Sequence, residues 1–113
     1  MPTDHPDTAP SDLAPASRIA LYRVVQEALT NVLRHAPGAP TVVQTDSTGE
    51  CFEVLVVSQP PPVRPSPPDT AGGHGLRGMR QRVEACGGQL AWQPLPSGGF
   101  EVRARLPLAK VPA

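Results

Sequence analysis

The sequence contains no long hydrophobic run and no excess of charge of either sign. Its apolar stretches are all shorter than the roughly 18 residues that a helix needs to cross a bilayer. Its first residues lack the charged-then-apolar pattern of a signal peptide. Ten basic side chains balance ten acidic ones, so no bulk positive field draws the chain to nucleic acid or to an acidic membrane surface. We therefore expect a soluble, cytoplasmic domain that binds no nucleic acid and makes no direct contact with a membrane.

Cysteine is also scarce. Cys51 and Cys86 are far apart in the sequence and show no metal-ligand spacing. We interpret them as two half-buried thiols in a reducing compartment. The sequence has no internal repeat, and its length of 113 residues suits one domain with a modest core.

Proline, by contrast, is abundant, with 16 residues in the chain. Residues 1–15 combine Pro, Asp, Thr and Ser with few apolar side chains, which predicts a flexible leader or the remnant of a linker. Six more prolines fall within 60–68, "PPPVRPSPP". Because proline cannot donate to a sheet and disfavours a helix, we predict an irregular loop here that continues to the glycines after Asp69.

Hydrophobic periodicity predicts two helices and four strands. The first helix runs from about Ala16 to Ala36, with Pro15 at its start, Ser17 as a possible cap and Pro37-Gly38 as its stop. The second helix spans about 76–86, and the strands span 41–46, 51–58, 89–95 and 99–106. This order predicts an α+β fold, a two-layer α/β sandwich whose mixed, mostly antiparallel sheet is covered by helices on one face. The domain would span 16–108, leaving 109–113 as a tail.

The first helix carries side chains suited to metal and proton chemistry. Glu27 and Asn31 are four residues apart and share a face, with Arg34 and His35 near the same line. An Asn amide oxygen is a hard, neutral ligand suited to Mg²⁺. A Glu one turn away could orient or deprotonate an attacking group. The spacing taken alone favours a solvated helix face on which Glu27 pairs with Arg23 or Arg34.

The stretch "GGHGLRGMRQR" places glycines in a G-x-G-x-x-G pattern at the start of the second helix. Gly73, Gly75 and Gly78 would let the backbone approach a phosphate, and the helix N-terminus would add free N–H groups and a positive dipole end. The preceding element is a proline loop and not a strand, which argues against a Rossmann fingerprint. We interpret His74 as a residue that positions the backbone of this turn. Trp92, the single tryptophan, is expected to pack on the sheet.

Taken together, two segments resemble a known family. "LYRVVQEALTNVLRHA" (21–36) resembles the N box of bacterial sensor histidine kinases, in the branch whose response regulators are of the nitrate-response type. "GHGLRGMRQRVEACGGQL" (74–90) resembles the G box of the same branch, and "GGFEVRARLP" (98–107) its closing strand. This branch belongs to the GHKL ATPase superfamily, and the resemblance implies its Bergerat fold. The implied function is the ATP-binding catalytic domain, which transfers phosphate from ATP to a histidine.

The resemblance implies a role for each matching residue. Asn31 would coordinate a Mg²⁺ ion that bridges the phosphates, and Glu27 would help to activate the phosphoacceptor histidine. Arg34 and His35 would lie near the phosphates. The phosphate-side turn would be formed by Gly73, Gly75 and Gly78 and shaped by His74 and Leu76. Residues 60–72 would be the ATP lid.

Two positions depart from the family pattern. The central strand ends in "VVSQP" (56–60), where the family places an Asp that accepts a hydrogen bond from the adenine amino group. We expect Ser58 at this position, where its hydroxyl, or the Gln59 amide oxygen, could still accept such a bond, directly or through water. A neutral acceptor should contribute less than a carboxylate, by about 1 kcal/mol or somewhat more. Phe100 stands where the family commonly has Thr. Adenine recognition is therefore altered at two linked positions.

No histidine of this chain matches the family's phosphoacceptor context. The resemblance thus implies a separate dimerisation and phosphoacceptor domain as partner, through which the parent kinase would be a homodimer, and a response regulator downstream. The parent sensor could itself be membrane-anchored. One alternative is a degenerate GHKL domain with weak or no ATP binding that acts as a protein-interaction module. Another is an anti-sigma-factor kinase, but the sequence "GHGLRGMRQRVE" argues against it.

Overall fold

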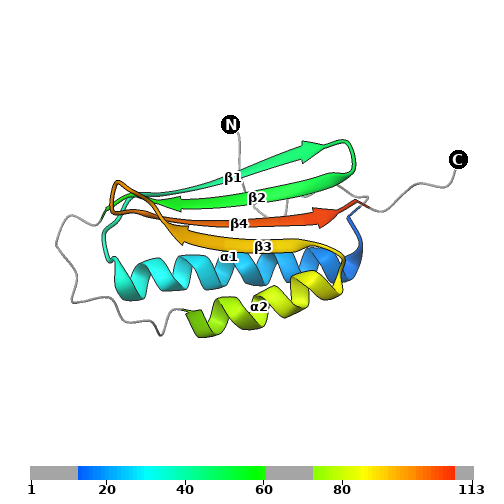
Figure 1. The fold of residues 1–113 in the computed structure, drawn as a ribbon, viewed down its shortest axis with the longest axis horizontal. Coiled ribbons are helices and arrows are strands. Elements are labelled where there is room, and N and C mark those ends of the chain that lie inside the picture. The colour runs from blue at the N-terminus through cyan, green and yellow to red at the C-terminus, as the bar shows by residue number, and fades with distance from the viewer. Residues whose placement is uncertain (1–12, 61–72, 109–113) are drawn as a thin grey trace, which may run out of the picture.

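The structure is a computed structural model that describes residues 13–60 and 73–108. In these residues two helices and four strands form two layers, with both helices on one face of the sheet (Figure 1). The elements are α1 (Pro15–His35), β1 (Thr41–Thr48), β2 (Cys51–Ser58), α2 (Gly73–Ala85), β3 (Gln89–Pro94) and β4 (Phe100–Pro107). The predicted two-layer α/β sandwich is therefore confirmed. Most of the predicted leader and lid, and the predicted tail, lie outside the described residues.

The sheet consists of two hairpins joined edge to edge. Its strand order is β1-β2-β4-β3, and each of the three pairings is antiparallel. The β1–β2 hairpin closes through Gly49 and Glu50, with a positive φ of 40° at the glycine. Strands β2 and β4 occupy the centre, and their register sets Ser58 opposite Phe100. The described sheet is thus antiparallel throughout, simpler than the mixed sheet that we predicted.

The core lies between the sheet and the helices. On β2 every second side chain is buried, a period-2 pattern that turns one face inward. The inward residues of β2 and β4 meet buried residues of α1, such as Leu21 and Val24, and Leu76 and Val83 of α2. Trp92 also packs against this core, as predicted, and the guanidinium of Arg80 lies 4.3 Å from its ring centroid.

The start of α1 differs from the prediction. Pro15 is the first helical residue, where its missing N–H costs nothing, and Ala14 is the N-cap without a side-chain capping bond. Ser17, which we predicted as a possible cap, is instead buried inside the first turn of the helix with 3% of its surface exposed. The first turn of α1 is therefore packed against the core and has no side-chain cap.

The end of α2 follows the prediction. Gly87 has a φ of 82°, the left-handed conformation that glycine tolerates best. Its N–H donates to the carbonyl of Glu84, and the N–H of Gly88 donates to the carbonyl of Val83, both at 2.9 Å. These two bonds form a Schellman motif, which satisfies carbonyls that the helix leaves unpaired.

The beginning of α2 was predicted wrongly. The helix starts at Gly73, three residues before the predicted Leu76, so the expected glycine turn is part of the helix. We predicted the start too late because glycine has a low helix propensity. Packing against α1 compensates for this low helix propensity, because it buries Leu76, which is 1% exposed.

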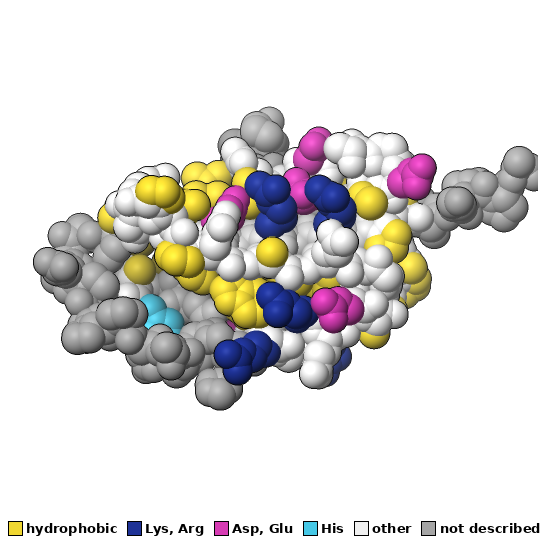
Figure 2. Space-filling view, viewed as in Figure 1, with side chains coloured by type: hydrophobic (Ala, Val, Ile, Leu, Met, Phe, Trp, Pro, Cys, Tyr) yellow, Lys and Arg dark blue, Asp and Glu magenta, His cyan; other side chains and the backbone are white. Residues whose placement is uncertain are grey.

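The opposite face of the sheet is open and charged. Glu53 lies 3.2 Å from Arg105 and 3.9 Å from Arg103, and Arg103 also reaches Glu101 at 3.3 Å. Figure 2 shows basic and acidic side chains side by side on the visible surface. Because both arginines are half exposed, each pair stabilises the fold by about 0–1 kcal/mol at most. The apolar layer under the helices therefore dominates stability.

Two leucines of α1 test this placement of the core. Leu21 is fully buried, whereas Leu33 is 75% exposed. We expect Leu21→Ala to lower the free energy of unfolding by about 2–5 kcal/mol and Leu33→Ala to change it by less than about 0.5 kcal/mol. Urea titrations followed by circular dichroism measure both. Similar losses at the two sites would contradict the assignment of the buried face of α1.

Candidate functional site

A polar stripe runs along the C-terminal half of α1, beside its buried apolar stripe. Glu27, Asn31 and His35 follow one another at four-residue steps, and all three are half-buried. The amide oxygen Oδ1 of Asn31 and the ring nitrogen Nε2 of His35 are buried atoms. For Nε2 the described part of the chain provides no hydrogen-bond partner. Buried polar atoms of this kind mark a place where a ligand can bind.

The first turn of α2 lies directly against this stripe. A Cβ atom added to Gly75 would overlap the carboxylate of Glu27. A side chain at Gly75 would therefore displace the Glu27 carboxylate from its present position. This contact shows that the two segments predicted to cooperate, the Glu27–Asn31 face and the G-x-G-x-x-G stretch, meet in the folded protein.

The alternative interpretation of Glu27 as a residue of a solvated, ion-paired face is not supported. Among the described residues, the ion pairs involve Glu53 and Glu101 but not Glu27. Neither Arg23 nor Arg34 approaches its carboxylate within ion-pair distance. Glu27 faces the backbone of α2.

A groove opens next to Glu27 between the two helices. It has a volume of about 540 Å³ and is formed by α1 and by Met79 of α2; the lining residues are Arg23, Gln26, Glu27, Leu29, Thr30, Leu33 and Met79. Two of its apolar members are exposed, Leu29 at 37% and Leu33 at 75%. Sequence reasoning missed this surface because it followed the buried stripe only. The recurrence of Ile19, Tyr22, Leu29 and Leu33 along a second face was the available signal.

At the end of β2, Ser58 is buried with 3% of its surface exposed. Its hydroxyl donates a long hydrogen bond of 3.4 Å to the carbonyl of Phe100 on β4. A Cβ added to Gly99 would overlap the carbonyl oxygen of Ser58, so the backbone is closely packed here. The structure thus brings together Ser58 and Phe100, the two positions at which the sequence departs from the family pattern.

The remaining predicted residues lie along the same two helices. Arg34 is exposed near the end of α1. Leu76 is buried and contributes to the core beneath the start of α2, whereas Gly78 is exposed and a Cβ there would meet no atom within 4 Å. Gly73 begins α2. The side chain of His74 and residues 61–72 of the predicted lid lie outside what the structure describes.

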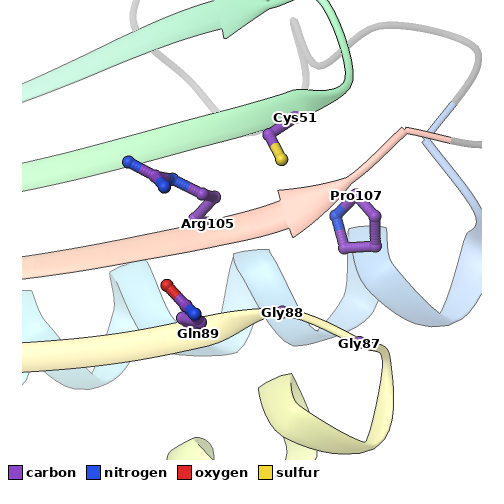
Figure 3. Close-up of a pocket in the computed structure, with 6 residues that line it drawn as sticks. All are labelled: Cys51, Gly87, Gly88, Gln89, Arg105 and Pro107. Carbon is purple, nitrogen blue, oxygen red and sulfur yellow. The ribbon is translucent and has the colours of Figure 1, made fainter.

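A second hollow lies at the other end of the sheet, where β2 begins and β4 ends (Figure 3). Cys51, Gln89 and Arg105 project around it from three neighbouring strands. Arg105 is already paired with Glu53, and both cysteines of the chain are free thiols of intermediate exposure, as predicted. This end carries none of the predicted site residues.

Comparison with known proteins gives the family. Residues 16–110 match the profile of the histidine kinase-, DNA gyrase B- and HSP90-like ATPases. The chain belongs to this family. It is 32% identical over 90 residues to the sensor histidine kinase YxjM of Bacillus subtilis, covering 78% of this chain and 21% of that protein. It is 37% identical over 78 residues to the histidine-protein kinase/phosphatase UhpB of Salmonella typhimurium, covering 69% and 15%.

Solved structures agree with this assignment at the level of the fold. The mycobacterial sensor histidine kinase MprB superimposes with a TM-score of 0.61 at 22% identity, over 83% of this chain and 76% of that one. The chain spans only about a fifth or less of the two curated relatives named above. Its profile match identifies it as the ATP-binding domain of this family. Neither described helix is long and apolar enough to cross a membrane.

The residues present fit a magnesium nucleotide. Asn31 supplies a buried amide oxygen, the ligand type that Mg²⁺ accepts beside waters and phosphate oxygens. The described residues contain no cluster of three or more His, Cys, Asp or Glu that would form an all-protein metal cage. Most ligands would therefore have to come from phosphates and water. The space beside Gly75 is occupied by the carboxylate of Glu27.

The contact between Glu27 and Gly75 can be tested by a double-mutant cycle. Replacing a helical glycine by alanine ordinarily stabilises a protein by about 0.5–1 kcal/mol. We expect this gain for Gly78→Ala, but not for Gly75→Ala, because its methyl group overlaps the Glu27 carboxylate. In the Glu27→Ala background, Gly75→Ala should regain it, which gives a coupling energy on the order of 1 kcal/mol.

Urea unfolding of the single and double variants measures this coupling. Gly78→Ala is the matched control, since it should have the same effect in both backgrounds. Equal effects of the two glycine substitutions in the parent protein would show that Gly75 and Glu27 are not in contact.

Proposed function

We propose that this ATPase domain transfers the γ-phosphoryl group of ATP to a histidine on a separate dimerisation and phosphoacceptor domain, in two-component signalling. The meeting of Glu27, next to Asn31, with the glycine start of α2 carries this proposal. Phosphoryl transfer needs a cation–phosphate site and a group that prepares the attacking atom, held close together. The contact between Glu27, one helical turn from Asn31, and Gly75 of α2 supports this proposal.

Each residue of the cleft has a proposed role. Asn31 holds the Mg²⁺ ion, which when bound neutralises phosphate charge. The first turn of α2, at Gly73 and Gly75, offers N–H groups and the positive end of its dipole to the phosphates. His35 and Arg34 lie one turn beyond Asn31, and we assign them to the phosphate side as well. Catalysis then rests on positioning and charge neutralisation.

Glu27 is proposed to act on the acceptor histidine. Its carboxylate lies at the cleft and also lines the open groove between α1 and α2. A neutral imidazole is the nucleophile in such a transfer, and a carboxylate that accepts a hydrogen bond from its second nitrogen orients it and stabilises the charge that develops. The exposed Leu29 and Leu33 offer an apolar surface for the partner domain that carries this histidine.

The wider assembly follows from the same proposal. The phosphoacceptor domain would form the homodimer of the parent kinase, and the phosphoryl group would pass on to a response regulator. Because ATP is the phosphoryl donor, we place the domain on the cytoplasmic side.

A degenerate domain that binds nucleotide weakly or not at all is the second candidate. The neutral Ser58 in place of an acid, and Phe100 beside it, favour this reading. Thermal unfolding with and without Mg-ATP separates the two. A ligand at 100 times its dissociation constant stabilises a protein by about 2.7 kcal/mol. No shift in melting temperature at millimolar ATP would support the degenerate domain.

The metal ligand is tested by Asn31→Ala. We expect the variant to lose Mg²⁺-dependent binding of a non-hydrolysable ATP analogue, which isothermal titration with and without Mg²⁺ measures. Gln44→Ala, which removes a similar amide from the exposed face of β1, is the control and should bind like the parent. If Asn31→Ala binds the magnesium nucleotide as tightly as the parent, the metal assignment is wrong.

The catalytic carboxylate is tested by Glu27→Gln. The amide keeps the size of the side chain but loses its charge, so nucleotide binding should persist while the rate of histidine phosphorylation falls by about 10²–10⁴-fold. Single-turnover transfer from labelled ATP to the separately supplied phosphoacceptor domain measures the rate. Glu84→Gln, an exposed position of α2, is the matched control and should transfer at the parent rate. An undiminished rate for Glu27→Gln would remove Glu27 from the mechanism.

A further inference from the structure

We propose that the outer face of α1 binds an amphipathic helix whose flanks are acidic. The binding surface, which we call the outer seam, is a row of exposed side chains on the face of α1 that points away from the core; its members are Ile19, Tyr22, Gln26, Leu29 and Leu33. This inference goes beyond the proposed function, which uses only the last two of these residues, and it requires no nucleotide.

Exposed apolar side chains are concentrated on this face of α1. Among the described residues, five large hydrophobic side chains are exposed, and four of them belong to the outer seam, with exposed fractions from 37% at Leu29 to 75% at Leu33. The fifth, Val42, lies on β1. Single exposed apolar residues are ordinary on a protein surface, but a group of them on one helix face indicates an interaction site.

The spacing of the outer seam indicates a helix as its partner. Its members follow one another at steps of three, four, three and four residues, so the pattern repeats every seven residues. This is the spacing with which one α-helix packs along another, because it keeps the side chains of successive turns in line. From Ile19 to Leu33 the seam is about 21 Å long, and a helix of about 15 residues would cover it.

The groove between α1 and α2 runs beside the outer seam. Gln26, Leu29 and Leu33 of the seam line this groove from α1, and Met79 lines it from α2. The groove has a volume of about 540 Å³. A helix that lies on the seam can therefore place side chains in the groove and contact α2 as well, as amphipathic helices do when they bind in apolar grooves.

The net charge of the helical layer indicates that the partner is acidic. The two helices together carry six arginines and two glutamates, a net charge of +4. The four strands and the turn residue Glu50 carry four acidic residues and two arginines, a net charge of −2. The balanced charge of the whole chain thus hides a positive helical layer. A partner that docks on this layer gains affinity and a faster encounter from negative charge.

The charges nearest the outer seam have the same sign. Arg23 lines the groove, and Arg82 is exposed three residues after Met79, on the same face of α2. The single carboxylate of α1, that of Glu27, also lines the groove but lies against Gly75 of α2. We therefore expect acidic residues of the partner helix to lie opposite the arginines on the α2 side of the seam.

A second copy of this chain fits the outer seam less well. Pairing two seams would bring two helical layers together, each with a net charge of +4. Like charges across an interface disfavour association and select against that partner. An acidic helix meets the same apolar surface without this repulsion, so we assign the seam to a separate partner.

Fluorescence anisotropy of labelled synthetic peptides tests the proposal on the unchanged protein. Each peptide is about three heptads long. The acidic peptide has Leu at the seam positions and Glu beside them, the basic peptide has Lys in place of Glu, and the scrambled peptide has the composition of the acidic one without its heptad order. Like charges beside the seam keep the first two peptides from pairing with themselves.

We expect the acidic peptide to bind at least about tenfold more tightly than the basic or the scrambled peptide. Equal affinity for the acidic and the scrambled peptide, or tighter binding of the basic one, would overturn the proposal. Analytical ultracentrifugation of the protein alone tests the other occupant. A dimer that Leu33→Ser abolishes would assign the seam to a second copy. The assays contain no nucleotide, so their outcome is independent of ATP binding.

Apolar variants locate the binding surface. Ile19→Ser and Leu33→Ser remove exposed side chains from the two ends of the seam, and each should weaken binding of the acidic peptide by about tenfold. Val42→Ser removes an exposed apolar side chain from β1 and should bind like the parent. Unchanged affinity in both seam variants, with folding verified by circular dichroism, would show that the peptide binds elsewhere.

A pair of charge variants tests the acidic character of the partner. Arg23→Gln should weaken the acidic peptide and strengthen the basic one, each by about threefold or more, because the arginine lies beside the seam. Gln44→Glu makes the same change in net charge on the exposed face of β1, and we expect it to change neither affinity by more than about twofold. Equal effects of the two substitutions would contradict a local contact with Arg23.

Discussion

The proposed cleft of this protein depends on the approach of two helices at a single glycine. The Glu27 carboxylate occupies the space that a side chain at Gly75 would need. The apolar residues Leu76 and Val83 hold α2 on the core, while Leu21 and Val24 hold α1. Because both helices are fixed by buried side chains, the polar groups between them are kept in place without a strong direct bond. Packing of the core thus positions the proposed site where the two helices meet.

The sheet contributes to the same end of the molecule. Strand β2 ends at Ser58 and β4 begins at Phe100, so the inner face of the sheet finishes beside the C-terminal half of α1 and the start of α2 (Figure 1). The charged network of Glu53, Arg103 and Arg105 lies on the other face and is largely exposed. The charged side chains of the sheet lie on its open face, whereas the side chains of its inner face are neutral. Among the described residues of α1 and the sheet, Glu27 is therefore the carboxylate that lies between the two layers.

Family membership and residue chemistry support different parts of this picture. The profile match over 16–110 and the kinase relatives establish an ATPase domain of the histidine kinase type. They do not determine how this chain treats the nucleobase, because Ser58 and Phe100 are its own departures from the family pattern. In this chain Ser58 is buried and bonded to the neighbouring strand.

The sequence by itself determined the order of the elements, the two-layer architecture, the stop at Gly87-Gly88 and the grouping of Glu27 with Asn31. These features are local, because period, helix breakers and four-residue spacing act between neighbours along the chain. Tertiary structure alone decided where α2 begins, that Ser17 is buried instead of capping the helix, and that the Glu27 carboxylate lies against Gly75. Low glycine propensity predicted a later helix start, and only packing of Leu76 and Gly75 against α1 overrides it. Contacts between residues about 50 positions apart have no signature in local spacing, so they become visible only when the chain is folded.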